Sequence, residues 1–107
     1  MEEFLKLIDE TGMATIPDGM TEIGDGAFCA CSRLTDIVIP DSVTAIGSFA
    51  FHNCTSLTGI VIPDSVTKIG DEAFSACSDL KNVKIPNGIE LGKGVFSECK
   101  NLRLESC

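Results

Sequence analysis

Apolar residues along this chain recur with a fixed period of 23 residues. An isoleucine followed by proline marks each period, at Ile16, Ile39, Ile62 and Ile85. A fixed period of roughly 20–30 residues is typical of a solenoid, in which successive coils stack and bury a shared core. We therefore predict a single domain over residues 1–107. Residues 1–15 supply an N-terminal cap and first strand, and the repeats are 16–38, 39–61, 62–84 and 85–107.

Three further apolar columns run through these four repeats. The phenylalanines are Phe28, Phe51, Phe74 and Phe96; the leucines are Leu34, Leu57, Leu80 and Leu102; the cysteines are Cys31, Cys54, Cys77 and Cys99. With Ile37, Ile60 and Val83 they are predicted to fill the interior. The last repeat is one residue shorter, so its later columns shift by one.

The end of each repeat is predicted to be a strand. Residues 34–40 are rich in β-branched side chains and end at a proline, which has no N–H to offer a sheet. Stacked coils would place such strands about 4.8 Å apart in a narrow parallel sheet. The Val-Thr-x-Ile-Gly stretch is predicted to form a second short strand, ending at Gly24, Gly47, Gly70 and Gly92. The Ala-Phe-x-x-Cys spacing that follows predicts a short helical or 3₁₀ turn.

The two ends of the stack are predicted to differ. Apolar positions within Glu2–Glu10 indicate a capping helix that packs Phe4 and Ile8 onto the first coil. Residues 102–107 carry no polar capping unit, and an open strand edge invites pairing with another chain. We therefore take Leu104 and Cys107 as candidate contacts of a homo-oligomer formed through the C-terminal coil.

The repeat Ile-Pro-Asp-Ser-Val-Thr-x-Ile-Gly-x-x-Ala-Phe-x-x-Cys-x-x-Leu-x-x-Ile resembles the BspA-like leucine-rich repeat, over residues 16–101. The resemblance implies a right-handed α/β leucine-rich-repeat solenoid with one sheet along a face. It also implies a non-enzymatic role, often at the surface of bacteria and protozoa that adhere to host matrix proteins or other cells. The family has no short binding motif that could be transferred to particular residues.

The expected function is therefore a protein-binding or adhesion module that presents a repeat surface to a protein partner. The alternative is a structural or self-assembling scaffold unit, or a fragment of a longer repeat protein. By resemblance the protein is expected at the cell surface or secreted. The residues after Met1 are acidic and lead into no long apolar stretch, so no signal peptide is visible. As written, the chain is expected to stay inside the cell unless an export signal has been removed.

The net negative charge of the chain disfavours negatively charged partners. The net charge is −8, with ten acidic and two basic residues in 1–65 and six of each in 66–107. Nucleic acids and anionic membranes both repel such a chain, so neither is an expected partner. The apolar residues are spread along the chain without the run of about 18 that a membrane span needs.

The six cysteines and the column of acidic residues after the prolines are candidate ligand sites. The repeated cysteines are interpreted as buried, reduced thiols, although neighbouring coils bring them near disulfide distance. Cys29 and Cys31 with His52 lack the paired motifs of a structural zinc site. Asp18, Asp41 and Asp64 offer one carboxylate per coil, which suits a turn after proline better than calcium. No metal or cofactor is expected.

No catalytic residue is predicted. His52 is the one histidine in the sequence, and the repeat brings no titrating partner beside it. It is interpreted as a solvated surface residue, and the chain is not expected to be an enzyme.

The candidate partner-binding surface is the outward face of the strands together with one aromatic residue. Strand alternation turns one column toward solvent at Asp36, Gly59 and Asn82, and another at Val38, Val61 and Lys84. Phe49 breaks a column otherwise filled by Gly26, Glu72 and Gly94. An exposed ring at that position is a candidate contact, although β-branched and apolar residues also occur singly on ordinary surfaces.

Overall fold

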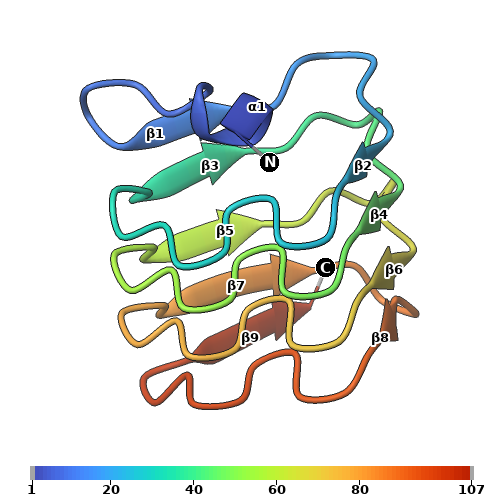
Figure 1. Cartoon of the computed structure of the whole chain (residues 1–107). Coiled ribbons are helices and arrows are strands. Elements are labelled where there is room, and N and C mark those ends of the chain that lie inside the picture. Colours follow the sequence, from blue (N-terminus) through green and yellow to red (C-terminus); the bar gives the residue numbers. More distant parts are fainter. Residues whose placement is uncertain (1, 107) are drawn as a thin grey trace.

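Each period of the sequence forms two short strands on different sides of a stack of coils (Figure 1). The computed structural model describes residues 2–106, and the side chains of residues 4–103. One side carries β1 (Met13–Thr15), β3 (Asp36–Val38), β5 (Gly59–Val61), β7 (Asn82–Ile85) and β9 (Arg103–Ser106). The other carries β2 (Glu22–Ile23), β4 (Ala45–Ile46), β6 (Lys68–Ile69) and β8 (Glu90–Leu91).

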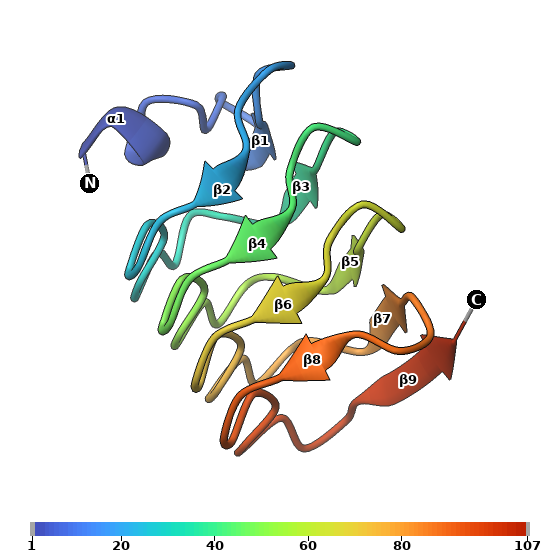
Figure 2. The same ribbon diagram turned by 90° about the vertical axis from the view of Figure 1, so that its right-hand side faces the viewer.

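All the pairs within these sheets are parallel, as predicted for stacked coils. Glu22 lies opposite Ala45, and Ala45 opposite Lys68, so the 23-residue period becomes the register of the sheet. The sheet β2-β4-β6-β8 runs unbroken along the stack (Figure 2). The opposite side is interrupted: β1 pairs with β3, and β5 pairs with β7, which in turn pairs with β9, whereas β3 and β5 do not pair.

The last coil is shorter than predicted. Ile69 lies opposite Leu91, which reflects the one missing residue seen in the sequence. Asn82 lies opposite Arg103, so a second residue is lost before β9. The register therefore places Leu104, rather than Glu105, opposite the buried Val83.

The phenylalanine column forms the centre of the core. The rings of Phe28 and Phe51 stack at a centroid distance of 5.4 Å, and those of Phe51 and Phe74 at 5.0 Å. Phe96 continues the column at 5.6 Å from Phe74. The predicted leucine and isoleucine columns pack around these rings and are buried except at their last members, Leu102 and Ile85, which are partly buried. This confirms the assignment of the interior for the first three coils.

The predicted helical turns are wrong. From residue 24 to 31 the N–H groups alternate: Ala27 and Cys29 bond to carbonyl oxygens three residues back, whereas Phe28 and Ala30 bond to the next coil. Gly26 and Ala30 have positive φ angles of 66° and 58°, and this left-handed backbone interrupts a helix. The segment is a series of tight turns whose remaining N–H groups hold the coils together.

The predicted helix over Glu2–Glu10 is also wrong in extent, because α1 covers only Glu2–Leu5. The Asp9 carboxylate accepts hydrogen bonds from the N–H groups of Thr11 (2.8 Å) and Met13 (3.1 Å). Such local side-chain bonds offer the backbone an alternative to the helix. Phe4 and Ile8 nevertheless pack on the first coil, with the Phe4 ring edge-on to Phe28 at 5.6 Å.

The C-terminal coil is less well covered than the others. Leu91 is exposed, and Phe96, Cys99 and Leu102 are only partly buried. Their counterparts in the preceding coils, such as Phe74, Cys77 and Leu80, are fully buried. Within the described residues, β8 and β9 each have a neighbour on one side only.

Glycine lets successive coils approach closely at the end of the second strand. A Cβ atom at Gly70 would lie 2.5 Å from the backbone nitrogen of Ser48 and 2.8 Å from the carbonyl carbon of Gly47. Gly47 and Gly92 meet the same close approach. Gly24 in the first coil has no coil beneath it, and its nearest neighbour is the Phe4 ring at 4.0 Å.

We expect Gly70→Ala to lower the free energy of unfolding by about 1–3 kcal/mol, because backbone atoms must move to admit the methyl group. Gly24→Ala is the matched control. It should leave stability unchanged or raise it slightly, since the new methyl group meets no backbone and the unfolded chain loses freedom. Urea denaturation of both variants measures the difference. Equal losses in the two variants would show that the close approach does not limit stability.

Candidate functional site

The outer face of β3, β5 and β7 carries most of the residues singled out in the sequence. Strand alternation buries Ile37, Ile60 and Val83 and turns their neighbours outward. Val38 is 44% exposed and Val61 is 61% exposed, in adjacent coils. Two aliphatic side chains therefore lie side by side on an open surface.

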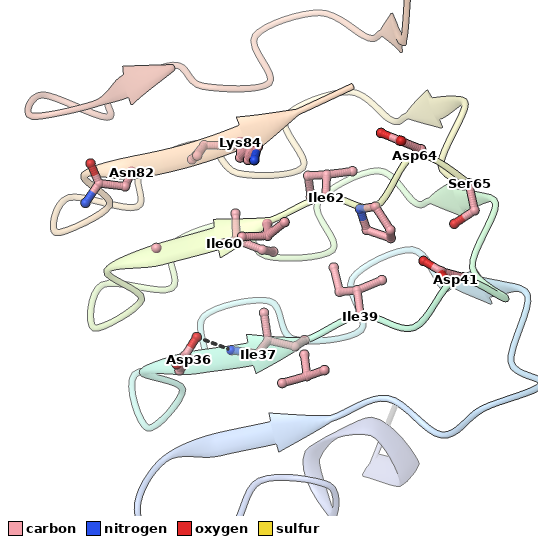
Figure 3. A pocket seen from close by; sticks show the side chains of 15 residues that line it. Asp36, Ile37, Ile39, Asp41, Ile60, Ile62, Asp64, Ser65, Asn82 and Lys84 are labelled. Atoms are coloured by element: carbon pink, nitrogen blue, oxygen red, sulfur yellow. Dashed lines mark hydrogen bonds between the residues drawn. The ribbon is translucent and has the colours of Figure 1, made fainter. Parts of the chain in front are cut away.

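The break between β3 and β5 lies under this surface. An open hollow of about 880 Å³ extends over the two strands and reaches β7 (Figure 3). Its floor includes Ile37, Ile39, Ile60 and Ile62. Ile37 and Ile60, on either side of the break, are 5% and 4% exposed, whereas Val83 at the same position in the continuous part of the sheet is 0% exposed. The floor of the hollow is therefore aliphatic and slightly open to solvent.

Charged and polar residues surround this aliphatic floor. Asp41 and Asp64 lie in the turns that follow the prolines, at one side of the hollow in Figure 3, and Asp36 lies at the other. Asp36 accepts a hydrogen bond from the N–H of Ile37 at 2.9 Å. Among the described residues, Asp41 and Asp64 make no hydrogen bond or ion pair. Lys84 is the one basic residue of the lining, so the hollow is acidic on balance.

The structure brings together six of the seven residues proposed from the sequence. These six line the hollow: Asp36, Val38, Gly59, Val61, Asn82 and Lys84. The sequence argument missed the contribution of Asp41 and Asp64, which it assigned to turns alone. Their recurrence directly after proline in consecutive repeats was the available signal.

Phe49 is not part of the hollow. It lies in the turn after β4, and its ring is 39% exposed and meets the His52 ring edge-on at 5.4 Å. Its φ angle is 60°, a left-handed conformation that is unfavourable for a bulky residue. Gly26 and Gly94 occupy the same position in other coils, and Glu72 shares the strain. The column identified in the sequence is thus a left-handed position where glycine would be favoured.

His52 has a polar partner in the next coil. Its Nδ1 lies within hydrogen-bond distance of the Ser75 hydroxyl oxygen. The same hydroxyl oxygen lies 3.2 Å from the Glu72 carbonyl oxygen, so Ser75 bridges the two groups, and the direction of its bond to His52 is set by the tautomer of the imidazole. His52 is half-buried by these contacts, more than the solvated residue that the sequence suggested.

The repeated cysteines line the interior as free thiols. Cys54 donates to the Phe28 carbonyl oxygen at 2.9 Å, and Cys77 donates to that of Phe51 at 3.0 Å. Burial raises the pKa of both thiols to about 12. The prediction of four buried thiols is correct for these two, whereas Cys31 and Cys99 at the ends of the column are partly exposed. The described residues contain no group of three or more side chains placed to bind a metal ion.

The two proposed oligomer contacts, Leu104 and Cys107, lie in the last four residues of the chain. Cys107 lies outside the described residues. The backbone of Leu104 belongs to β9, but its side chain is not described. Within the described chain no helix is long and apolar enough to cross a membrane.

The sequence matches one known family of repeat proteins. Residues 8–105 match the BspA type leucine rich repeat region in six copies. The chain belongs to the BspA-type leucine-rich repeat family. The match begins before the first of the four predicted repeats and includes the strand that precedes it.

Solved structures of bacterial leucine-rich repeat proteins are similar to this chain. One from Bacteroides ovatus is 40% identical with a TM-score of 0.80, over 89% of this chain and 25% of that one. A leucine rich cell surface protein from Faecalibacterium prausnitzii is 28% identical with a TM-score of 0.78, over 91% of this chain and 32% of that one. The T. pallidum leucine rich repeat protein is 31% identical with a TM-score of 0.72, over 88% and 57% respectively.

This BspA-type chain therefore spans between a quarter and just over half of these three structures. No curated protein sequence matches it.

Replacing Phe49 with glycine is expected to change the free energy of unfolding by less than about 1 kcal/mol. Relief of left-handed strain, about 1–2 kcal/mol, offsets the loss of a half-exposed ring and the added freedom of the unfolded chain. Phe51→Ala removes a buried ring from the stack and should cost about 3–5 kcal/mol. Chemical denaturation compares the two. A loss above about 2 kcal/mol in Phe49→Gly would mean that this ring is structural.

Native alkylation should separate the cysteines by burial. At pH 8 with iodoacetamide, Cys29 is expected to react first because it is exposed. Cys54 and Cys77 should stay unmodified until the chain unfolds, since burial excludes the reagent and the raised pKa suppresses the reactive thiolate. Peptide mapping by mass spectrometry gives the rate at each site. Similar native rates at Cys29 and Cys54 would contradict the buried thiol column.

Proposed function

We propose that this BspA-type chain is a non-enzymatic protein-binding or adhesion module, and that the hollow over β3, β5 and β7 is its binding surface. The observation that carries the proposal is the pairing of exposed Val38 and Val61 above an aliphatic floor. Exposed apolar side chains clustered over a concave surface favour contact with a partner.

Several features support a binding role over a catalytic one. Proteins of the leucine-rich repeat family are generally non-enzymatic modules. The Nδ1 of His52 is hydrogen-bonded to the Ser75 hydroxyl, and the thiols of Cys54 and Cys77 donate to backbone carbonyl groups. These side chains serve the stack itself, whereas Val38 and Val61 do not.

The proposed cellular location rests on one similar protein. The similar protein from Faecalibacterium prausnitzii is named a cell surface protein. We propose a surface or secreted role for this chain too, with residues 1–107 acting as one domain of four repeats and an N-terminal cap.

A second candidate is self-assembly through the C-terminal coil. The partial exposure of Phe96, Cys99 and Leu102, together with the exposed Leu91, favours this candidate. An end-to-end contact there would cover the ring of Phe96 as each internal coil covers its neighbour. Light scattering across a concentration series tests it, and a monomer at every concentration would exclude it.

Val61→Glu tests the binding surface directly. The side chain is exposed, so the melting temperature should stay within about 2 °C. The immobilised Val61→Glu chain should retain at least about tenfold less of the partner proteins that the immobilised wild-type chain captures. The reason is that binding would bury a charge against an apolar contact. Quantitative mass spectrometry of the captured proteins gives the ratio.

Thr67→Glu is the matched control. It adds the same charge on the opposite side, immediately before β6, where Thr67 is exposed. It should retain the partners that Val61→Glu loses. Equal capture by wild type and Val61→Glu would overturn the assignment of the binding surface.

A further inference from the structure

The hollow combines three properties that restrict what can occupy it. It has an aliphatic floor, it has two exposed valines, and its carboxylates outnumber its one lysine. Asp41 and Asp64 have no partner within the described chain that would neutralise them. A complementary ligand therefore offers aliphatic side chains next to positive charge.

The arrangement of the carboxylates also restricts the shape of the ligand. Asp41 and Asp64 occupy the same repeat position, four residues before Ala45 and Lys68, which lie opposite each other in the paired strands β4 and β6. Paired strands lie about 4.8 Å apart, which sets the spacing of the two coils at this end of the hollow. One turn of an α-helix rises about 5.4 Å, so cations one turn apart can face successive coils. Alternate side chains of an extended strand lie about 6.6–6.8 Å apart, which does not match the spacing of the two coils.

The size of the hollow agrees with a short helical contact. It extends across the three coils that carry β3, β5 and β7, and on the opposite side β4, β6 and β8 of the same coils pair in an unbroken sheet. Two strand spacings of about 4.8 Å amount to about 10 Å along the stack. That length corresponds to about two helical turns. A helix lying along the stack would set its aliphatic stripe over Val38 and Val61 and one basic row beside Asp41 and Asp64.

We propose that the partner segment bound in this hollow is a basic amphipathic α-helix of a protein. This inference rests on the proposed function and adds the chemistry and shape of the partner. Val38 and Val61 receive the aliphatic stripe, and Asp41 and Asp64 bind the lysine or arginine residues beside it. Asp36 provides a further carboxylate at the far side of the hollow.

The test uses three labelled 16-residue peptides and fluorescence anisotropy with the full chain. The first has a leucine stripe with a row of lysines one helical turn apart. The second peptide has glutamates in place of those lysines. The third is a scrambled version of the first peptide, with the same composition and charge but no leucine stripe. The first peptide should bind at least about tenfold more tightly than either control, and its affinity should fall with added salt.

Charge variants then locate the contact. The double variant Asp41→Asn, Asp64→Asn should bind the lysine peptide roughly 3- to 10-fold more weakly, which is the effect expected for the loss of two exposed ion pairs. Glu22→Gln with Glu90→Gln removes the same charge from exposed positions on the second sheet, and should leave the affinity unchanged. Equal affinities of the three peptides, or equal effects of the two double variants, would overturn the helix proposal.

The outcomes separate this inference from the proposed function. If Val61→Glu abolishes partner capture while the lysine peptide binds no better than its controls, the surface binds a partner of other chemistry. If Val61→Glu has no effect on capture, the proposed function itself fails. A wild-type dimer that Val61→Glu dissociates would instead make the hollow an interface between copies, and the helix proposal would be wrong.

Discussion

Every part of this structure depends on coils stacking in register at the spacing of β-strands. At Gly70 the backbones approach so closely that a methyl group would meet the preceding coil at 2.5 Å. The N–H groups of Phe28 and Ala30 use the same proximity to bond to the next coil. Because each coil lies directly above the last, any residue type that recurs in the sequence becomes a continuous column in space.

The columns explain both the stability of the middle and the difference between the ends. Phe51 has a ring on each face and is fully buried, whereas Phe96 has a described neighbour on one side only. At the other end the Phe4 ring turns edge-on and covers Phe28. The interior is thus built from repeated nearest-neighbour contacts, and each coil depends on the coils beside it.

Departures from the repeat produce the features that suggest function. Pairing stops between β3 and β5, and the hollow with its exposed valines extends over that interruption. Phe49 holds a left-handed backbone position that glycine fills in two other coils. Both features depart from what the other coils share, and the proposed binding role rests on the first of them.

The sequence by itself determined the period, the buried columns, the two strands of each coil and the outward position of Val38 and Val61. These follow from which residues recur, because recurrence reports what all coils share. Only the tertiary structure decided the break between β3 and β5, the place of Asp41 and Asp64 beside the hollow, and the second residue lost before β9. It also replaced the predicted N-terminal helix with one turn and an Asp9-centred loop. Such differences arise where a coil adjusts to its particular neighbours, and a repeat pattern carries no information about them.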